Sequence, residues 1–334
     1  MKPTSKTRLP RFACAVLFTA AAAWSARADF PSLVLSHNPI AYWQLNETAP
    51  ASPPLNTLTN YGSLGATGNG IAVRQVTKGQ PGKVGNAISL YNGGSAIACY
   101  SKVDVPYSAA LNPKPPFSAE FWAYPTRNDQ TLCAISSMDC QLNGGGSRQG
   151  WLVYENGNAN WQFRLGLIAG YAVILGSSTP PAVGAWQHIV VTFDGSTAKI
   201  YVNGVLNGSA AVGAGWTPNT EMPLMMGCLP LVGGGADTVD GPAVSFGGLA
   251  GYRGFDGSLD EVAIYSSLLS ASTIKAHYDA ATTNTAGYHA QILADNPVGY
   301  WTCEDPAVTP PNPGTFPIAV NSGSLGSVVN GTNM

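Results

Sequence analysis

The sequence holds few residues whose type and spacing suit catalysis. Hydrolysis of a glycosidic bond needs two carboxyl groups roughly 5–9 Å apart. Asp260 and Glu261 are adjacent in a strand-like segment, so their side chains are expected on opposite faces, where they cannot act as a pair. His188 shares a face with Val190 and Thr192, and no Asp or Ser pattern lies beside it. We therefore predict no catalytic residues and interpret His188 as a core residue; the alternative is a glycoside hydrolase or lyase.

Asp260 is the residue that most strongly suggests a bound ion. By strand alternation it shares a face with Val262 and Ile264, which are expected to point inward. A carboxylate that enters a core must be paired, bonded to amides or bound to a metal. Calcium prefers oxygen ligands, so we predict one structural Ca²⁺ held by Asp260 and Glu47. The alternative is that Asp260 accepts backbone N–H bonds across a turn.

Aromatic residues in glycine-rich loops are the candidates for ligand binding, because sugar rings stack on exposed Trp and Tyr. Trp216, Trp151 and the pair Tyr252–Arg253 occupy such loops. Loops on a rigid scaffold are where binding usually resides. We predict these four residues as ligand contacts; the alternative is that each anchors its own loop.

The first 28 residues resemble a secretory signal peptide. Four basic residues precede an apolar run at 12–24 that is too short to cross a bilayer, and small residues at 26 and 28 suit cleavage after Ala28. Loss of this segment leaves 11 basic against 18 acidic residues and no basic cluster. We therefore predict a secreted or cell-surface protein that binds no nucleic acid and does not insert into a membrane.

Five cysteines follow this segment, and secretion would favour disulfides. Cys133 and Cys140 flank the short stretch AISSMD, so we predict that they pair, and Cys99 with Cys228 is the remaining pair. The alternative is that these residues are buried thiols. No CxxC motif occurs, and four histidines give little support to a zinc site.

Most of the chain alternates with the period of strands. Apolar and polar residues alternate over 117–124 and 161–168, while 187–193, 198–202 and an Asn-Gly turn at 203–204 read as consecutive antiparallel strands. One helix is expected after the strand 258–265, capped by Ser270. The pattern predicts an all-β sandwich of two antiparallel sheets with one short C-terminal helix.

The chain also repeats itself at long range. NPIAYWQLNE at 38–47 returns as NPVGYWTCED at 296–305, and NYGSLGATGNG at 60–70 returns as NSGSLGSVVNG at 321–331. An interval this long is that of a whole domain. We predict one complete module over 29–285, which folds alone, and the loosely held start of a second, truncated module over 286–334, with further modules in the same chain.

Three segments resemble laminin-G-like (LamG-like) jelly-roll domains. AWQHIVVTFDGSTAKIYVNGVLNG at 185–208 is similar to their central strand and hairpin, and FDGSLDEVAIYSSLLSASTIKAHYDAA at 255–281 to their last strand and helix. GNAISLYNGGSAIACY at 85–100 resembles an early strand, with Tyr91 and Asn92 in place of Phe and Asp. The resemblance implies a concanavalin A-like jelly roll. It also implies modules arrayed on secreted proteins, where they bind glycans or proteins and often hold a structural calcium.

We therefore predict a secreted, non-catalytic recognition or adhesion module that binds carbohydrate or an extracellular protein. A structural spacer in a large surface protein and a glycan-active enzyme are the alternatives. An exposed cluster of Trp216 and Tyr252 would favour binding, buried or scattered aromatics would favour the spacer, and convergent carboxylates in a groove would favour the enzyme.

Overall fold

A computed structural model describes most of the chain between residues 57 and 307. The described residues are 57–74, 76–93, 101–139, 148–167, 170–220, 222–229, 253–307, 318–319 and 331–332. The chain divides into two units, residues 51–310 and a second unit of 1–50 with 311–334. In the second unit the structure describes one ladder, β17 (Ile318–Ala319) with β18 (Gly331–Thr332).

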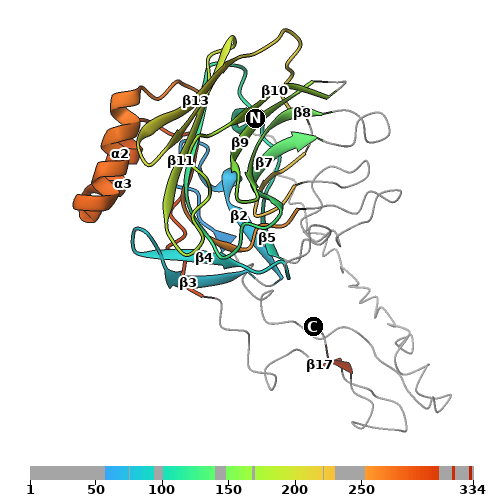
Figure 1. Cartoon of the computed structure of the whole chain (residues 1–334). Coiled ribbons are helices and arrows are strands. Elements are labelled where there is room, and N and C mark those ends of the chain that lie inside the picture. The colour runs from blue at the N-terminus through green and yellow to red at the C-terminus, as the bar shows by residue number, and fades with distance from the viewer. Residues whose placement is uncertain are drawn as a thin grey trace, which may run out of the picture. The chain divides into compact units, whose positions relative to one another are not determined.

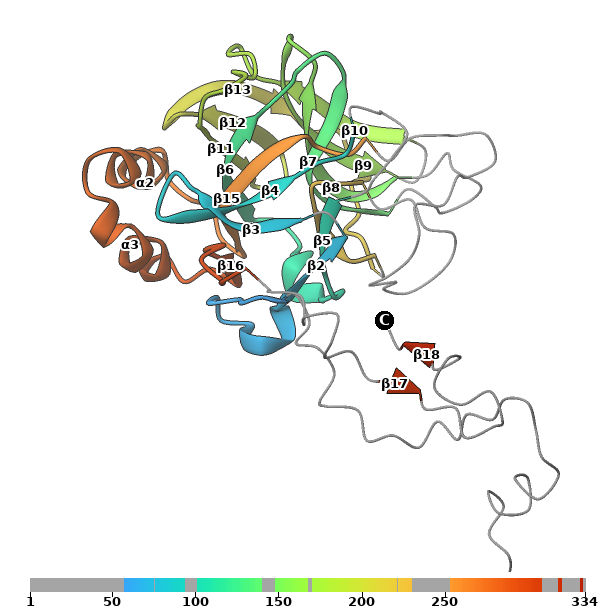
Figure 2. The same ribbon diagram turned by 90° about the horizontal axis from the view of Figure 1, so that it is seen from below.

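Two antiparallel sheets form the larger unit (Figures 1 and 2). The first sheet runs β1 (Thr57–Leu58), β2 (Gly70–Arg74), β5 (Ser101–Val105), β14 (Leu224–Met226), β7 (Thr131–Asp139), β8 (Gln149–Asn156), β9 (Asn160–Leu167), β10 (Gly170–Gly176). The second sheet runs β13 (Val205–Ala211), β12 (Thr197–Val202), β11 (Gln187–Phe193), β6 (Phe117–Pro125), β15 (Gly257–Tyr265), β4 (Asn86–Leu90), β3 (Thr77–Pro81). A further strand, β16 (Gly299–Trp301), pairs with β15.

The predicted alternation explains why these segments form a sandwich. Phe117 and Phe121 of β6 point into the core, where they meet Phe163 and Trp161 of β9 at ring distances of 6.4 and 6.3 Å. All four side chains are fully buried. The predicted all-β fold of two antiparallel sheets is therefore confirmed.

The Asn-Gly turn is also placed as predicted. Asn203 and Gly204 join β12 to β13, and both have positive φ, 52° and 77°. These angles suit a tight hairpin turn between twisted strands. The Asn203 side chain accepts a hydrogen bond from His188 N (2.9 Å), which ties the turn to β11.

Helices cover the outer face of the second sheet, the face that points away from the first sheet (Figure 2). Helix α2 (Ala271–Thr283) begins as predicted, because Ser270 Oγ accepts a hydrogen bond from Thr273 N (3.0 Å). A second helix, α3 (Tyr288–Ala294), was not predicted: its seven residues are too few for a clear helical period. Three 3₁₀ turns lie at η1 (Gly65–Gly68), η2 (Ala109–Leu111) and η3 (Thr285–Gly287). Among the described residues, no helix has the length and apolarity needed to span a membrane.

A β-bulge in β15 corrects the predicted orientation of Asp260. The register against β6 shifts between Asp260 and Ala263, and Glu261 at the shift has φ 54°. Because a bulge adds one residue, it reverses which face the later residues occupy. Val262 and Ile264 therefore point into the core, whereas Asp260 pairs with Trp122 of the outer face. Asp260 does not share their inward face.

The C-terminal segment belongs to the sandwich, which corrects the predicted separation at residue 286. Strand β4 pairs with residues 257–259 of β15, and β16 pairs with residues 262–264, so β16 continues the line of β4. Trp301 is fully buried in the core. Residues 288–305 are thus an integral part of the unit, while the repeat itself stays a sequence prediction. Residues 1–28 and 38–47 lie outside the described residues.

The predicted Cys133–Cys140 disulfide is wrong. The stretch between these residues is no loop but part of the continuous strand β7, which ends at Asp139. An extended strand rises about 3.3 Å per residue, so roughly 20 Å separates the Cα atoms of Cys133 and Asp139, whereas a disulfide needs less than about 7 Å between its Cα atoms. Cys133 is a buried thiol. Cys228 is disulfide-bonded, and its predicted partner Cys99 lies outside the described residues, so that pair stays a prediction.

Candidate functional site

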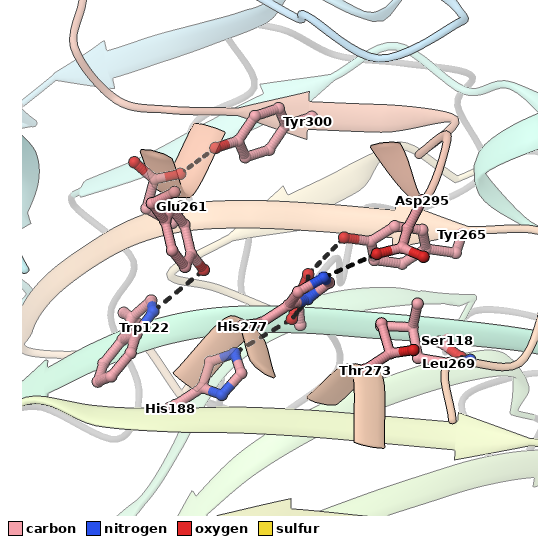
Figure 3. A network of polar contacts seen from close by, with 12 residues as sticks. Ser118, Trp122, His188, Glu261, Tyr265, Leu269, Thr273, His277, Asp295 and Tyr300 are labelled. Atoms are coloured by element: carbon pink, nitrogen blue, oxygen red, sulfur yellow. Dashed lines mark hydrogen bonds and ion pairs between the residues drawn. The ribbon is translucent and has the colours of Figure 1, made fainter. Parts of the chain in front are cut away.

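A buried network of ionisable side chains lies between the second sheet and its helices (Figure 3). Its centre is Glu120 of β6. His188 Nε2 of β11 lies 3.1 Å from Glu120 Oε2, and His277 Nδ1 of α2 lies 3.1 Å from both carboxylate oxygens. The Tyr265 hydroxyl of β15 donates a further hydrogen bond to Glu120. On its other side, His277 Nε2 lies 2.8 Å from Asp295 Oδ2.

The electrostatics of this network favour a charged pair. Burial alone would raise the pKa of Glu120, but the charge of His277 and the hydrogen bonds from both histidines hold that pKa well below its usual value. Burial would lower the pKa of His277, but Glu120 and Asp295 raise it. Glu120, His188 and His277 are all fully buried, so no substrate can reach them.

The network follows from the alternation of β6. Ser118, Glu120 and Trp122 all lie on the outer face, where Ser118 Oγ accepts a hydrogen bond from Leu269 N (2.9 Å) just before α2. Trp122 stacks on His188 at 4.9 Å, and its Nε1 donates to the Tyr288 hydroxyl of α3 (3.2 Å). The same face of β6 thus connects both helices to the sheet. This agrees with the interpretation of His188 as a core residue.

A second polar cluster lies beside the bulge of β15. Glu261 Oε1 lies 2.7 Å from His289 Nε2 of α3, and the Tyr300 hydroxyl of β16 donates to Glu261 Oε2. Glu304 accepts hydrogen bonds from Asn86 N (3.0 Å) and Nδ2 (3.1 Å). One ligand atom from each of Glu261, His289 and Glu304 lies within 4.8 Å of the others, a spacing that would suit a metal ion. Because both carboxylates of the bulge lie on the outer face, the predicted opposite placement of Asp260 and Glu261 is also wrong.

Asp260 makes the backbone contacts that formed the alternative to calcium. Its Oδ2 accepts hydrogen bonds from Lys83 N (2.8 Å) and Val84 N (3.0 Å), while its buried Oδ1 has no partner. Burial, and then the charge of Glu261, raise the pKa of Asp260 well above its usual value despite these amides. Burial also raises the pKa of Glu261, although the hydrogen bonds from His289 and Tyr300 oppose the rise. Glu47 lies outside the described residues.

A buried acid in the other sheet lacks a hydrogen-bond partner within the described part of the chain. Glu155 of β8 is fully buried, and neither of its carboxylate oxygens accepts a hydrogen bond from a described residue. Burial raises its pKa to about 9, against a small opposing influence of the Arg127 charge. The folded protein therefore holds Glu155 in its neutral form at pH 7.

The residues predicted as ligand contacts do not form one platform. Trp151 is 1% exposed and packs in the core, 6.0 Å from the Phe117 ring. Trp216 is half-buried, and its Nε1 donates to Gly150 O (3.0 Å), so it anchors its loop. Arg253 donates to Thr131 O (3.5 Å) and lies over the Tyr154 ring at 5.6 Å. Tyr252 lies outside the described residues.

A depression on the second sheet instead combines aromatic rings with hydroxyl groups. It has a volume of about 290 Å³ and is lined by Gln80, Pro81, Ser89, Tyr124, Trp186 and Ser258. Ser258 of β15 is the cross-strand neighbour of both Ser89 and Tyr124. The partly exposed rings of Tyr124 and Trp186 lie 5.5 Å apart at an angle of 57°. Trp186 was not among the residues predicted from the sequence as ligand contacts, so this site was missed.

Comparisons with known proteins bear on the fold. A model of the concanavalin A-like lectin/glucanases superfamily matches residues 98–275, more than half of the chain. This match confirms the resemblance drawn from the sequence motifs. No curated protein matches the chain by sequence.

Three solved structures illustrate what the chain is similar to. The binding domain of botulinum neurotoxin DC in complex with SialylT is 14% identical, with a TM-score of 0.45 over 64% of this chain and 46% of that chain. The binding domain of Paraclostridial Mosquitocidal Protein 1 is 14% identical, with a TM-score of 0.44 over 68% of this chain and 52% of that chain. The third structure is domain 4 of AbnA, a GH43 extracellular arabinanase from Geobacillus stearothermophilus, in complex with arabinotriose. It is 17% identical, with a TM-score of 0.42 over 66% of this chain and 97% of that chain. This chain thus spans about half the length of the two toxin chains.

Proposed function

This chain belongs to the concanavalin A-like lectin/glucanases superfamily, and from that membership we propose that it is a secreted, non-catalytic module that binds carbohydrate. The superfamily includes both lectins and hydrolases, so the choice rests on the site and not on the fold. The observation that carries the proposal is the depression formed by Tyr124, Trp186 and the serines beside them. The predicted signal segment at 1–28 supports secretion.

The lining of this depression suits a sugar ring. Aromatic rings offer apolar faces to the C–H side of a pyranose, and hydroxyl and amide groups can bond its hydroxyls. Trp186 and Tyr124 supply the faces, while Ser89, Ser258 and Gln80 supply the polar groups. Four of these five residues are positioned by strands of one sheet, so little ordering is needed on binding.

The placement of the acidic residues supports binding without catalysis. Glycoside hydrolysis needs carboxyl groups that touch the glycosidic bond. Glu120, Asp260 and Glu261 are at most 1% exposed, so they are not accessible to a glycan at the surface. None of them lines the depression of Trp186.

A glycan array tests this function. The full chain is expected to bind a subset of immobilised glycans and to release no product from them. Failure to bind any glycan would instead support the structural spacer, which the burial of Trp151 and the anchoring of Trp216 favour. Release of shortened glycans would contradict the non-catalytic assignment.

We further propose one structural cation, with Ca²⁺ as its first candidate, at the bulge of β15. Oδ1 of Asp260 is buried without a hydrogen-bond partner among the described residues, and burial, followed by the charges of neighbouring carboxylates, raises the pKa values of Asp260 and Glu261; a cation would offset both effects. The backbone N–H groups of Lys83 and Val84 donate to Asp260, and that of Asn86 donates to Glu304, so the two carboxylates meet at the same turn. The oxygen donors fit Ca²⁺, whereas His289 would suit Zn²⁺ better.

Calcium should therefore raise the melting temperature. A ligand at a hundred times its dissociation constant adds about 2.7 kcal/mol, which for a domain of this size is roughly 5–10 °C. Glu304→Gln should remove most of the shift, and Asp279→Asn on the exposed face of α2 should keep it. The shift should shrink as pH falls, because the raised pKa values favour the neutral, non-binding carboxyls in acid.

Melting curves in excess CaCl₂, in ZnCl₂ and in EDTA measure this effect. Curves that superimpose under all three conditions would show that Asp260 is held by its backbone amides alone. A larger shift with zinc than with calcium would assign the ion through His289.

A further inference from the structure

The place that β16 occupies is a strand site built from distant segments. We use "strand site" for residues 60–68 together with 262–264. On one side, Val298 N donates to Ile264 O (2.8 Å). On the other side, Tyr61 N donates to Tyr300 O (2.7 Å) and Leu64 N to Val298 O (3.0 Å). These hydrogen bonds use the backbone, so any strand of suitable shape can make them.

Two side chains add specificity to this backbone pairing. Trp301 is fully buried, and its Nε1 donates to Gly68 O (2.9 Å). The Tyr300 hydroxyl donates to Glu261, and Tyr300 N donates to Asn60 Oδ1 (2.7 Å). A strand that enters the site therefore needs Tyr followed by Trp, with the Trp facing the core.

The chain carries this Tyr-Trp strand twice. Residues 38–47 repeat 296–305, so Tyr42 and Trp43 stand at the positions of Tyr300 and Trp301. The loop of the strand site, residues 60–70, also has its own copy at 321–331. The structure thus pairs the loop of the first repeat with the strand of the second repeat, whereas the strand of the first repeat precedes that loop.

We propose that the strand site is a shared acceptor, which residues 38–47 and 296–305 of the same chain occupy alternately. Residues 38–47 have the Tyr and the Trp that the site requires, at the positions of Tyr300 and Trp301, and the backbone hydrogen bonds of the site need no particular side chain. One acceptor with two donors makes the site a switch between two pairings of the same module.

Differences between the copies bias the site toward 296–305. The first copy has Ala41 in place of Gly299, and a Cβ at Gly299 would lie 2.5 Å from a ring atom of Trp301 and 2.9 Å from Leu111 Cδ2. The Trp ring would have to shift to admit that methyl group. Gly299→Ala makes the copies equal at this position and should move occupancy toward residues 38–47.

Cys303 is a built-in reporter of occupancy. It is a fully buried thiol while 296–305 fill the site, and the first copy has Leu45 there. Cys133, the buried thiol of β7, lies outside the exchanging segment and serves as the internal control. Labelling of the native full chain with iodoacetamide, followed by peptide mapping, gives the rate at each cysteine.

In the wild type, Cys303 is expected to be labelled faster than Cys133. The labelling rate of Cys303 should rise at least tenfold in Gly299→Ala and in Trp301→Ala. It should fall in Trp43→Ala. Each single Trp variant should melt close to the wild type, because the other copy fills the site. The double variant should melt about 10 °C lower.

Three results would overturn the proposal. If Cys303 is labelled no faster than Cys133 in any of the variants, residues 296–305 never leave the site. A Trp301→Ala variant that melts as low as the double variant would show that 38–47 cannot replace it. Labelling that depends on protein concentration, with dimers in solution, would place the strand of a second copy in the site and contradict exchange within one chain.

Discussion

Glu120→Ala should lower the free energy of unfolding by about 3–5 kcal/mol, as expected when one partner of a buried charged pair is removed. Glu120 accepts hydrogen bonds from Tyr265 and lies 3.1 Å from ring nitrogens of His188 and His277. Without it, these groups stay buried without their acceptor. Urea denaturation followed by circular dichroism measures the loss. Asp279→Ala, an exposed carboxylate of α2, is the matched control and should change stability by less than about 0.5 kcal/mol.

The pH dependence separates this network from simple packing. The lowered pKa of Glu120 contributes stability above its usual value of 4.5, and this contribution is lost as pH falls through the folded value. The raised pKa of His277 contributes stability below its usual value of 6.5, and this contribution is lost as pH rises through the folded value. The difference between wild type and Glu120→Gln should therefore be largest near pH 5–6 and decrease above it. A difference that does not change from pH 5 to pH 9 would contradict the charged pair.

Glu155→Gln should have the opposite sign and stabilise the protein at pH 7. The pKa of Glu155 is raised from 4.5 to about 9, so at pH 7 the unfolded chain carries the ion while the folded protein carries the neutral acid. At 1.36 kcal/mol per pH unit, folding then costs about 3 kcal/mol that an uncharged Gln of similar shape avoids. The free energies of unfolding of the two proteins should therefore be equal near pH 4, and the extra stability of the variant should increase with pH until about pH 9.

Urea denaturation of wild type and Glu155→Gln at pH 4, 7 and 9 tests this window. Asp279→Asn provides a control, because this carboxylate lies on the exposed face of α2. A stability difference that is constant across the three pH values would show that Glu155 is ionised in the folded protein.

Local patterns predicted the strands and the first helix. Alternation over 117–124 and 161–168 identified the inward faces of β6 and β9, because a strand buried on one side repeats every two residues. The Asn-Gly turn and the Ser270 cap are chemical requirements of a few neighbouring residues. Such features depend little on the rest of the chain.

The errors arose where distant residues decide the outcome. The bulge at Glu261 is set by the pairing of β15 with β6, and once it is present, alternation no longer places Asp260. The Cys133–Cys140 prediction assumed a loop where β7 continues between two neighbouring strands. The partner of His188, Glu120, lies 68 residues away on the adjacent strand, so sequence spacing gave no signal of their contact.

The candidate carbohydrate site was hidden for the same reason. Trp186 precedes β11 within a strand motif, and that position favoured burial. Its partial exposure becomes visible only when β3, β4, β6 and β15 bring Gln80, Ser89, Tyr124 and Ser258 around it. Glycine-rich loops, by contrast, directed attention to Trp151 and Trp216, whose rings pack against Phe117.

Isothermal titration of the full chain with the best glycan from the array tests the central claim most directly. Trp186→Ala is expected to weaken binding at least tenfold, about 1.4 kcal/mol, while the variant stays folded at the temperature of the titration and the glycan in the cell stays intact. Tyr61→Ala, which removes an exposed aromatic ring outside the depression, should bind like the wild type. Binding by Trp186→Ala that equals the wild type would contradict the assignment of this site.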